Sequence, residues 1–556
     1  MAQSRGPAYP WRDVSPLRLA AIPALSALAA LTVGCGKKKE GDLVAAATLT
    51  SADAPAAANH ARDGEEPPSN LPDLPDDPTA PPVTLDGASR PWPPPPPKGV
   101  PLVAALAVET PVLSTPDVDA PRLGQLRAGA LVEMDPRAVT GRGCAGGYRK
   151  IKPMGFVCLG SATLELDHPI VRASSRRPDV TSRLPYIYGT ATRGGPAYAT
   201  LPTAKDLEAF EPHLASHLRR WSRDPVNGAT YGLDVWGKWK GAPLPPALVA
   251  MREHMTDPDI PWFVRDGART PNLSGLATGD TAKAGEFSRS NGVAFVDSFL
   301  HQGRRYNVAV DLRMMPADRF RPIRGSDFHG LRIPEDIDFP FAIVRKRGAR
   351  ALRAVGKGFA KGQRLAYRSA VKLTGHQRIR DGHLVYETVD GDWVDDQTAS
   401  RVRPARKMPG WAIAGEKWID ISVSKQTLIA YEGTKPVYVT LVSTGEAGLG
   451  DPEKSRATTR GIFRIHTKYL TATMDSKVVG EEFELRDVPY VQYFHQGYAL
   501  HAAYWHDVFG QPKSHGCINL APEDARRLFF WTGPRVPEGW HGAAKSRTGT
   551  VVFIHP

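Results

Sequence analysis

Apolar and polar residues alternate through much of region 411–556. The alternation is clearest in three short segments, 418–423, 427–431 and 437–443, which are rich in β-branched residues and are joined by short polar turns. Because side chains of a β-strand point to opposite faces in turn, this pattern predicts an antiparallel meander. Residues 458–465 add a turn and a further strand. We therefore expect the C-terminal region to be mainly β.

Two regions nearer the N-terminus show shorter strand patterns. Residues 101–165 contain apolar runs separated by turn residues, and a small all-β barrel fits them. Strand patterns return in residues 336–410, where Asp390-Gly391 marks a tight turn. Both regions resemble bacterial SH3-like domains. The expected fold class is mainly β and multidomain, with one or two small SH3-like barrels ahead of the C-terminal β-rich domain.

Residues 166–335 form a mixed region without a motif that indicates a function. Residues 206–221 have the apolar spacing of a helix, interrupted by Pro212. His213 and His217 lie four residues apart there, a spacing that can hold a metal ion. Since no third ligand is evident, we expect a surface or partly buried pair and no metal site.

Residues 1–35 have the layout of an export signal. Arg12 and Arg18 precede an uncharged stretch, 19–34, that is short for a transmembrane span. The stretch ends at Cys35 in Thr-Val-Gly-Cys, which resembles a bacterial lipobox, although its leucine lies one place further out. The resemblance implies a lipid-anchored protein of the periplasm or cell envelope, with Cys35 lipidated and bound to a membrane. A plain signal peptide or signal anchor is the alternative.

Residues 36–100 are expected to be a disordered, proline-rich linker. Fourteen prolines fall between residues 51 and 100, among few large apolar side chains. Such a segment cannot bury enough surface to offset its ordering entropy, so it stays extended.

The overall composition narrows the class of protein. The chain has 556 residues, of which 41% are hydrophobic and 23% charged, as in ordinary soluble globular proteins. Its net charge of +13 favours an anionic polymer such as a cell-wall glycan, or a membrane surface, unless it is merely a solvated basic surface. Basic residues are not interleaved with aromatic ones, so no nucleic-acid partner is expected.

The four cysteines are too few for a disulfide-dense scaffold. Cys144 and Cys158 lie in one predicted β unit of an exported chain, and we expect a disulfide between them. Closing a loop of this length contributes about 3 kcal/mol to stability. The alternative is two unpaired small core residues.

Cys517 is the strongest candidate for chemistry. A thiolate, not a thiol, attacks a carbonyl carbon, so a nucleophilic cysteine needs a nearby imidazole. His515 lies two residues before Cys517, and His501 lies sixteen before it, where it can approach from a neighbouring strand. Gly516 permits a tight turn, and the backbone N–H groups of Gly516 and Cys517 are candidate oxyanion donors.

The motif Ser514-His515-Gly516-Cys517-x-Asn519, with a histidine sixteen residues before the cysteine, resembles the signature of the L,D-transpeptidase (YkuD) family. The meander 418–443 and the Ser-Thr-Gly that ends it resemble the start of that family's catalytic domain. The resemblance implies a β-rich fold without a cofactor. It implies Cys517 as nucleophile and His501 as general acid/base. The supporting positions of the motif are matched by Ser514, His515, Gly516 and Asn519. Of these, His515 and Asn519 would orient the cysteine loop or the oxyanion.

The same resemblance implies peptidoglycan stem peptides as partners. Cys517 would form a thioester with a tetrapeptide stem and release D-alanine, and an amine of a second stem would complete a 3–3 cross-link. Two positions depart from the family pattern. Ala502 follows His501 where members often have glycine, and Thr458-Thr459-Arg460-Gly461 stands where many have Thr-Pro-x-Gly. Neither departure removes a reactive group.

Several alternatives stay open at this point. If water accepts the acyl group, the protein is an L,D-carboxypeptidase, and if a lysine of an envelope protein accepts it, the protein is a protein-to-peptidoglycan anchoring enzyme. If the domain is inactive, the chain is a lipid-tethered wall-binding protein. Cys517 can also be a buried structural cysteine, or a zinc ligand with His501, His506 and His515, although the spacings match no standard zinc finger. The oligomeric state is left open.

Overall fold

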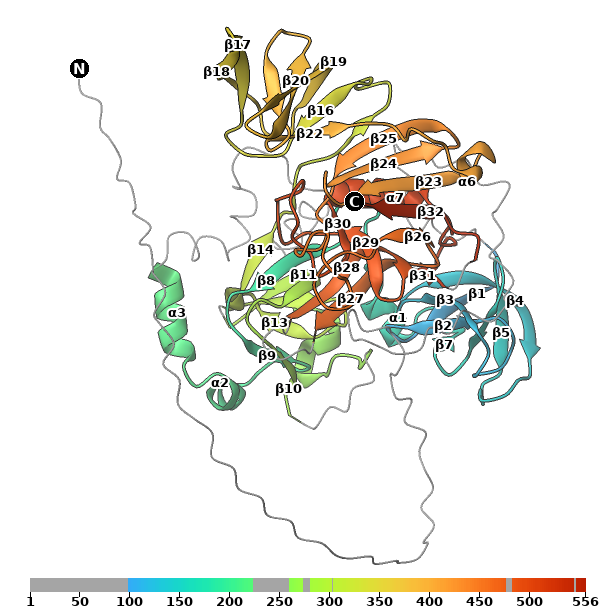
Figure 1. Cartoon of the computed structure of the whole chain (residues 1–556). Coiled ribbons are helices and arrows are strands. Elements are labelled where there is room, and N and C mark those ends of the chain that lie inside the picture. The colour runs from blue at the N-terminus through green and yellow to red at the C-terminus, as the bar shows by residue number, and fades with distance from the viewer. Residues whose placement is uncertain (1–98, 224–259, 274–280, 303, 477–482, 545–546) are drawn as a thin grey trace, which may run out of the picture. The chain divides into compact units, whose positions relative to one another are not determined.

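The computed structural model describes residues 99–223, 260–273, 281–302, 304–476, 483–544 and 547–556 (Figure 1). The predicted signal segment with Cys35 and nearly all of the predicted linker lie outside the described residues. Among the residues described, no helix combines the length and apolar character needed to cross a membrane. Strands outnumber helices and form several sheets, which confirms the expected mainly β class.

The first β unit has seven strands. They are β1 (Leu102–Ala105), β2 (Thr110–Leu113), β3 (Arg122–Leu126), β4 (Leu131–Val139), β5 (Tyr148–Ile151), β6 (Phe156–Cys158) and β7 (Ala162–Thr163). The strand order is β7-β1-β4-β5-β6-β2-β3. Gly124 and Gln125 of β3 pair with β31 (Gly542–Ala543) of the C-terminal region rather than with β7. The described pairings of this unit therefore stay open instead of closing into a barrel, and its SH3-like character stays a prediction.

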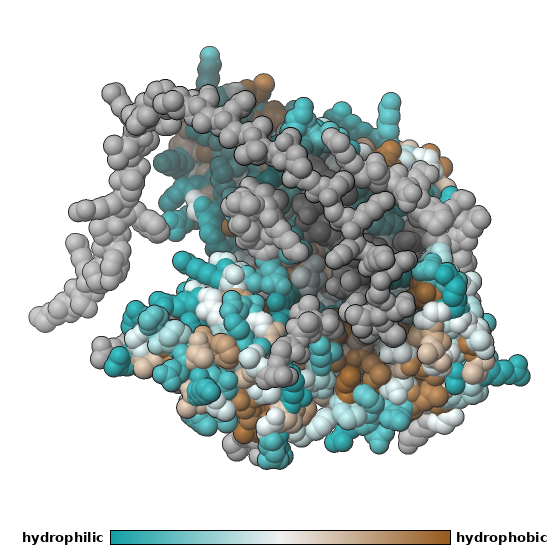
Figure 2. Space-filling view, turned by 90° about the horizontal axis from the view of Figure 1, so that it is seen from below, coloured by the Kyte–Doolittle hydropathy of each residue, from teal (hydrophilic) through white to brown (hydrophobic). Residues whose placement is uncertain are grey.

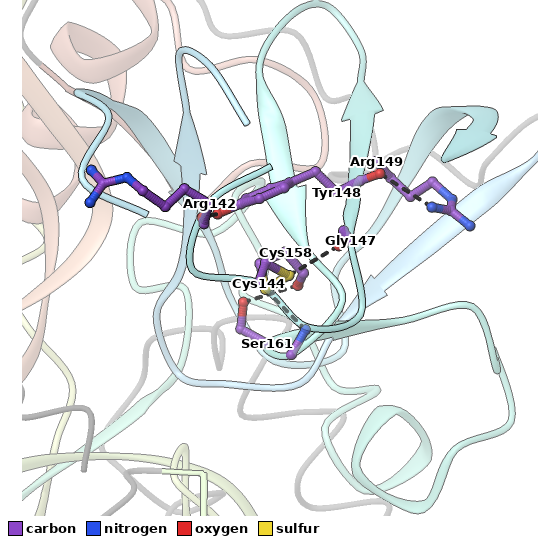
Figure 3. The surroundings of a disulfide bond; sticks show 8 residues. Arg142, Cys144, Gly147, Tyr148, Arg149, Cys158 and Ser161 are labelled. Atoms are coloured by element: carbon purple, nitrogen blue, oxygen red, sulfur yellow. Dashed lines mark hydrogen bonds between the residues drawn. A yellow bond between two sulfur atoms is a disulfide. The ribbon is translucent and has the colours of Figure 1, made fainter. Parts of the chain in front are cut away.

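The disulfide expected in this unit is present. Cys144 and Cys158 are bonded and join the turn before β5 to the end of β6 (Figure 3). Close by, the Tyr148 hydroxyl donates a hydrogen bond of 2.6 Å to the carbonyl of Arg142. The cross-link and this hydrogen bond hold the same turn from two sides.

A second unit of seven strands occupies the region in which the sequence shows no usable motif. Its strands are β8 (Ile187–Ala191), β9 (Gly195–Tyr198), β10 (Lys283–Phe287), β11 (Gly292–His301), β12 (Arg304–Ala309), β13 (Met314–Pro316) and β14 (Phe320–Ile323). Around them lie α1 (Pro169–Ala173), α2 (Ala204–Phe210), α3 (Leu214–Arg223) and the 3-10 turns η2 (Trp262–Gly267) and η3 (Ala317–Arg319). Residues 199–282 separate the paired strands β9 and β10, so no local hairpin signal marks them. The helical segment is interrupted between α2 and α3, as Pro212 predicts.

A third unit follows in residues 341–402. Its strands are β16 (Phe341–Val344), β17 (Arg350–Val355), β18 (Gly358–Arg364), β19 (Ala370–Arg380), β20 (His383–Thr388), β21 (Trp393–Asp395) and β22 (Ala399–Val402). In all three units the strands pair in the same order. The first strand lies between the fourth and the seventh, the fifth pairs antiparallel with the fourth and the sixth, and the second lies between the sixth and the third. The chain thus repeats one strand topology three times.

The C-terminal region contains two groups of strands. The first is a sheet in the order β15 (Leu331–Arg332), β25 (Lys435–Leu441), β24 (Thr427–Glu432), β23 (Lys417–Ser422), β32 (Val551–His555) and β26 (Gly461–Arg464). The short helix α6 (Gly410–Ile413) immediately precedes β23. The antiparallel pairs β23–β24 and β24–β25 are the predicted meander. The second group is β27 (Thr467–Ser476), β28 (Phe483–His495), β29 (Tyr498–Ala502) and β30 (Ile518–Leu520), followed by α7 (Pro522–Trp531).

A single buried cluster joins these two groups of strands and α7. It includes Ile419 and Leu428 from the first sheet, Leu500 and Ile518 from the second group, and Leu528 from α7, each fully buried. Each such side chain contributes about 1.5–3 kcal/mol by burial. The packing fixes β29 and β30 against the meander. By contrast, hydrophilic and hydrophobic residues are interspersed on the face of the molecule seen in Figure 2.

Candidate active site

Two neighbouring strands bring the predicted site residues together. β29 and β30 pair in parallel, with Leu500 opposite Ile518 and His501 opposite Asn519. Cys517 immediately precedes β30. The predicted base and the predicted nucleophile therefore lie on adjacent chain segments whose positions are fixed by the core beneath them, although sixteen residues separate them in sequence.

His501 is held with a defined orientation. Its side chain is buried, and Nδ1 lies 3.3 Å from the carbonyl oxygen of Ala502. A carbonyl can only accept a hydrogen bond, so the proton of the neutral ring sits on Nδ1 and Nε2 keeps its lone pair. Burial lowers the pKa of His501 to about 4, partly offset by this hydrogen bond. The imidazole is thus a neutral potential base near pH 7.

Cys517 is partly buried and packs against a cluster that includes Tyr493, Ala499 and Tyr504. Its Sγ lies 3.9 Å from the carbonyl of Gly497, which the thiol proton can reach. Burial raises the pKa of Cys517 to about 11, while a backbone hydrogen bond from Ala499 acts in the opposite direction. The resting thiol is protonated, so a nucleophilic role requires removal of its proton at the moment of reaction rather than a standing thiolate.

The turn before Cys517 needs glycine at position 516. Gly516 has φ +126°, and a Cβ there would collide with the ring of Tyr498. The Gly516 N–H donates to Ser514 Oγ at 3.1 Å, and Ser514 Oγ donates to the carbonyl of Cys517. Because its N–H already donates to Ser514 Oγ, Gly516 provides the turn conformation and not the oxyanion donor that the sequence predicts. The N–H of Cys517 remains as the other candidate oxyanion donor.

Thr458 anchors this turn, although in the sequence it stands out only as part of a departure from the family pattern. The fully buried Thr458 Oγ1 accepts a hydrogen bond from Gly445 N–H and donates one to the carbonyl of Gly516, both at 2.8 Å. Ser514 N–H also donates to the Thr444 carbonyl at 3.0 Å. The Ser-Thr-Gly segment at the end of the meander therefore supports the cysteine turn directly.

Asn519 is held by His506, which the sequence offered only as an alternative zinc ligand. Asn519 Nδ2 lies 2.9 Å from Nε2 of the partly buried His506, while the backbone of Asn519 pairs with Ser443. Burial lowers the pKa of His506 to about 4. His515, the second candidate base, has an exposed side chain and follows no strand. His501, unlike His515, is buried and lies on a strand beside the segment that bears Cys517.

The loop that carries His506 is tied to the third β unit. Arg368 donates to Asp507 at 2.6 Å, and the Arg368 guanidinium lies over the ring of Phe328 at 4.6 Å. Arg347 makes a longer ion pair with Asp507, at 3.2 Å. No short motif marks the two ion pairs, because they join residues 139 and 160 positions apart in the chain.

The described residues offer no cluster of three or more His, Cys, Asp or Glu side chains that could hold a metal ion. Of the i, i+4 pair on the predicted helix, His213 lies between α2 and α3, and His217 Nε2 contacts Asp318 at 2.9 Å. Asp318 also binds Arg304, which binds Glu211 in turn. His217 is thus part of a buried polar network that joins α3 to the second β unit.

Part of the C-terminal region matches a known protein family. Residues 416–554 match the model of the L,D-transpeptidase catalytic domain, YkuD. These residues form an L,D-transpeptidase catalytic domain. The match includes both strands of the candidate site, the cysteine turn and the segment around Thr458. No curated protein matches the chain.

Solved structures that resemble the chain include several L,D-transpeptidases. One from Xylanimonas cellulosilytica is 24% identical, with a TM-score of 0.19, and the match covers 27% of this chain and 65% of that one. One from Stackebrandtia nassauensis is 27% identical, with a TM-score of 0.18, covering 28% and 58%. The catalytic domain of the Enterococcus faecium enzyme is 22% identical, with a TM-score of 0.20, covering 25% and 98%. This chain thus spans less than two thirds of the first two relatives' length.

Proposed function

We propose that the L,D-transpeptidase domain is a cysteine acyltransferase that forms 3–3 cross-links between peptidoglycan stem peptides. The observation that carries the proposal is the pairing of β29 with β30, which supports a neutral imidazole beside the segment that bears Cys517. The Ala502 carbonyl accepts a hydrogen bond from Nδ1–H, so Nε2, which carries the lone pair, is available for the thiol proton.

The proposed acylation replaces a C–N bond of the stem peptide with a C–S bond to Cys517. Cys517 Sγ bonds to the carbonyl carbon between the third residue and the D-alanine of a tetrapeptide stem, and its proton passes to His501 Nε2. The C–N bond then breaks, and the amine of the departing D-alanine takes that proton. Proton transfer to His501 avoids the cost of a free thiolate, which burial makes unfavourable here.

The second step transfers the acyl group from sulfur to an acceptor. An amine of a second stem attacks the thioester carbonyl, loses its proton to His501, and releases the Cys517 thiol with a 3–3 cross-link formed. Water as acceptor would instead give a tripeptide stem, and a lysine of an envelope protein would give an anchored protein. The nucleophile is common to all three outcomes, so the acceptor has to be measured.

The test is incubation of the purified chain with tetrapeptide muropeptides, followed by mass spectrometry. Cross-linked dimers together with released D-alanine support transpeptidation, whereas tripeptides with D-alanine and no dimers assign a carboxypeptidase. Cys517→Ala is the control and should release no D-alanine.

A second experiment separates an enzyme from an inactive wall-binding protein. A carbapenem acylates only an activated nucleophile, so a stable adduct should form on the parent chain and be absent from Cys517→Ala. A parent chain that forms neither an adduct nor product would reject the proposed activity. Attachment to a membrane through a lipidated Cys35, with the domains in the cell envelope, is part of the same proposal, and mass spectrometry of the mature N-terminus tests it.

A further inference from the structure

The third β unit presents a basic hairpin. β17 and β18 are antiparallel, and the pairing of Val355 with Gly358 leaves Gly356 and Lys357 as a two-residue turn (Figure 1). Gly356 occupies the first turn position with φ +55°, a conformation that suits glycine, and a Cβ there would meet no atom within 4 Å. The tip of the hairpin is therefore open to its surroundings.

Positive charge is concentrated on this hairpin. Residues 341–380 contain twelve Lys or Arg residues and no Asp or Glu. Five of the basic residues lie on β17, the turn and β18, all with exposed side chains: Arg350, Arg353, Lys357, Lys361 and Arg364. Among the described residues, no carboxylate forms an ion pair with any of these five. The charge is consequently available to a partner.

An apolar residue accompanies the charge at the tip. Val355 is 59% exposed beside the turn, between Arg353 and Lys357. Because β18 is the edge strand of the sheet, basic residues on it can serve to prevent pairing with other strands. That role does not require an exposed valine next to the turn. Basic side chains around an exposed apolar tip match the boundary between lipid headgroups and acyl chains.

We propose that hairpin β17–β18 is a docking surface for an anionic lipid bilayer. The basic side chains contact headgroup phosphates, and Val355 enters the apolar boundary below them. A polyanionic glycan would attract the same charges but offers no apolar layer to Val355. This inference does not rest on the proposed activity, since it concerns a different unit of the chain.

The test uses the chain without residues 1–35, so that no acyl group can anchor it. Co-sedimentation is measured with vesicles of phosphatidylglycerol and phosphatidylcholine, and with phosphatidylcholine alone. The parent chain should bind only the anionic vesicles, and less tightly as salt is raised. Arg353→Gln/Lys357→Gln/Lys361→Gln should weaken binding by about 100-fold.

A matched control removes the same charge from residues that follow the third β unit in the chain. Arg403, Arg406 and Lys407 are exposed, and the triple change of these residues to Gln should lower affinity far less. Val355→Ser should also weaken binding while leaving its salt dependence unchanged. If the two triple variants lost the same affinity for anionic vesicles, binding would depend on the total charge of the chain and the proposal would be overturned. Absence of vesicle binding, with or without binding to isolated cell-wall glycan, would overturn it too.

Discussion

Nδ2 of Asn519 lies 2.9 Å from Nε2 of His506. The amide can donate to this ring nitrogen only while the nitrogen is unprotonated. Burial is the largest reason that the pKa of His506 falls to about 4, so the contact persists at neutral pH. Since Asn519 stands opposite His501 and two residues after Cys517, His506 fixes an amide beside the candidate catalytic pair.

Loss of the His506 imidazole should impair acylation without unfolding the domain. We expect His506→Ala to lower the rate of carbapenem adduct formation about tenfold, the effect of one hydrogen bond in a partly buried site. The rate is followed by mass spectrometry of the intact chain. His376→Ala, an exposed histidine of the third unit, is the control. An unchanged rate in His506→Ala would show that the Asn519 amide needs no such support.

The pH dependence of acylation should report the pKa of His501. A general base acts only when unprotonated, and burial lowers this pKa from its ordinary 6.5 to about 4. Acylation should therefore stay constant from neutral pH downward and fall only near pH 4. Because the unfolded chain binds this proton near pH 6.5 and the folded chain only near pH 4, the fold is most stable above pH 6.5 and loses stability as pH falls towards 4. His501→Ala should lower the rate by about 10²–10⁴.

Alkylation of Cys517 tests whether the resting thiol is neutral. Burial raises its pKa from 9.0 to about 11, so iodoacetamide should modify it slowly at pH 7, with a rate that still rises above pH 9. Relative to an unperturbed thiol, the neutral-pH rate should be lower by about 100-fold. Unfolding in urea should remove this protection. A rate that is already constant below pH 7 would instead indicate a standing thiolate–imidazolium pair.

Gly516→Ala should abolish acylation while preserving most of the fold. The residue has φ +126°, which L-residues rarely adopt, and a methyl group would strike Tyr498. We expect at least a 100-fold loss of adduct formation with an unchanged circular dichroism spectrum. The double variant Gly516→Ala/Tyr498→Ala should recover only part of the rate, because it relieves the collision but not the backbone strain. Full recovery would assign the whole effect to the collision.

Removal of the Cys144–Cys158 cross-link should destabilise the first β unit but spare the chemistry. The bond closes a loop with a sequence separation of 14, so replacing both cysteines with serine should lower the free energy of unfolding by about 3 kcal/mol. Denaturant unfolding with and without a reductant measures this. Carbapenem acylation at 25 °C should be unchanged, and a parallel loss of acylation would link the first unit to the site.

Local pattern was enough to predict the meander β23–β24–β25 and the cysteine motif. Strands joined by short turns leave a period-two signal, and His501, Gly516 and Cys517 belong to a compact motif. The cysteine pair was predictable because Cys144 and Cys158 lie in one small unit of an exported chain. In each case the residues that interact are close in sequence, or the chemistry restricts the residue types.

The sequence determined the strands of the meander and the candidate nucleophile and base, because these follow from periodicity within a few residues and from residue type. Only the tertiary structure decided that the second unit repeats the topology of the first, since residues 199–282 interrupt its β9–β10 pair. It also decided that Thr458 anchors Gly516, that His506 holds Asn519, and that burial leaves Cys517 protonated. These contacts and pKa shifts depend on long-range packing, and no local pattern encodes the surroundings of a side chain.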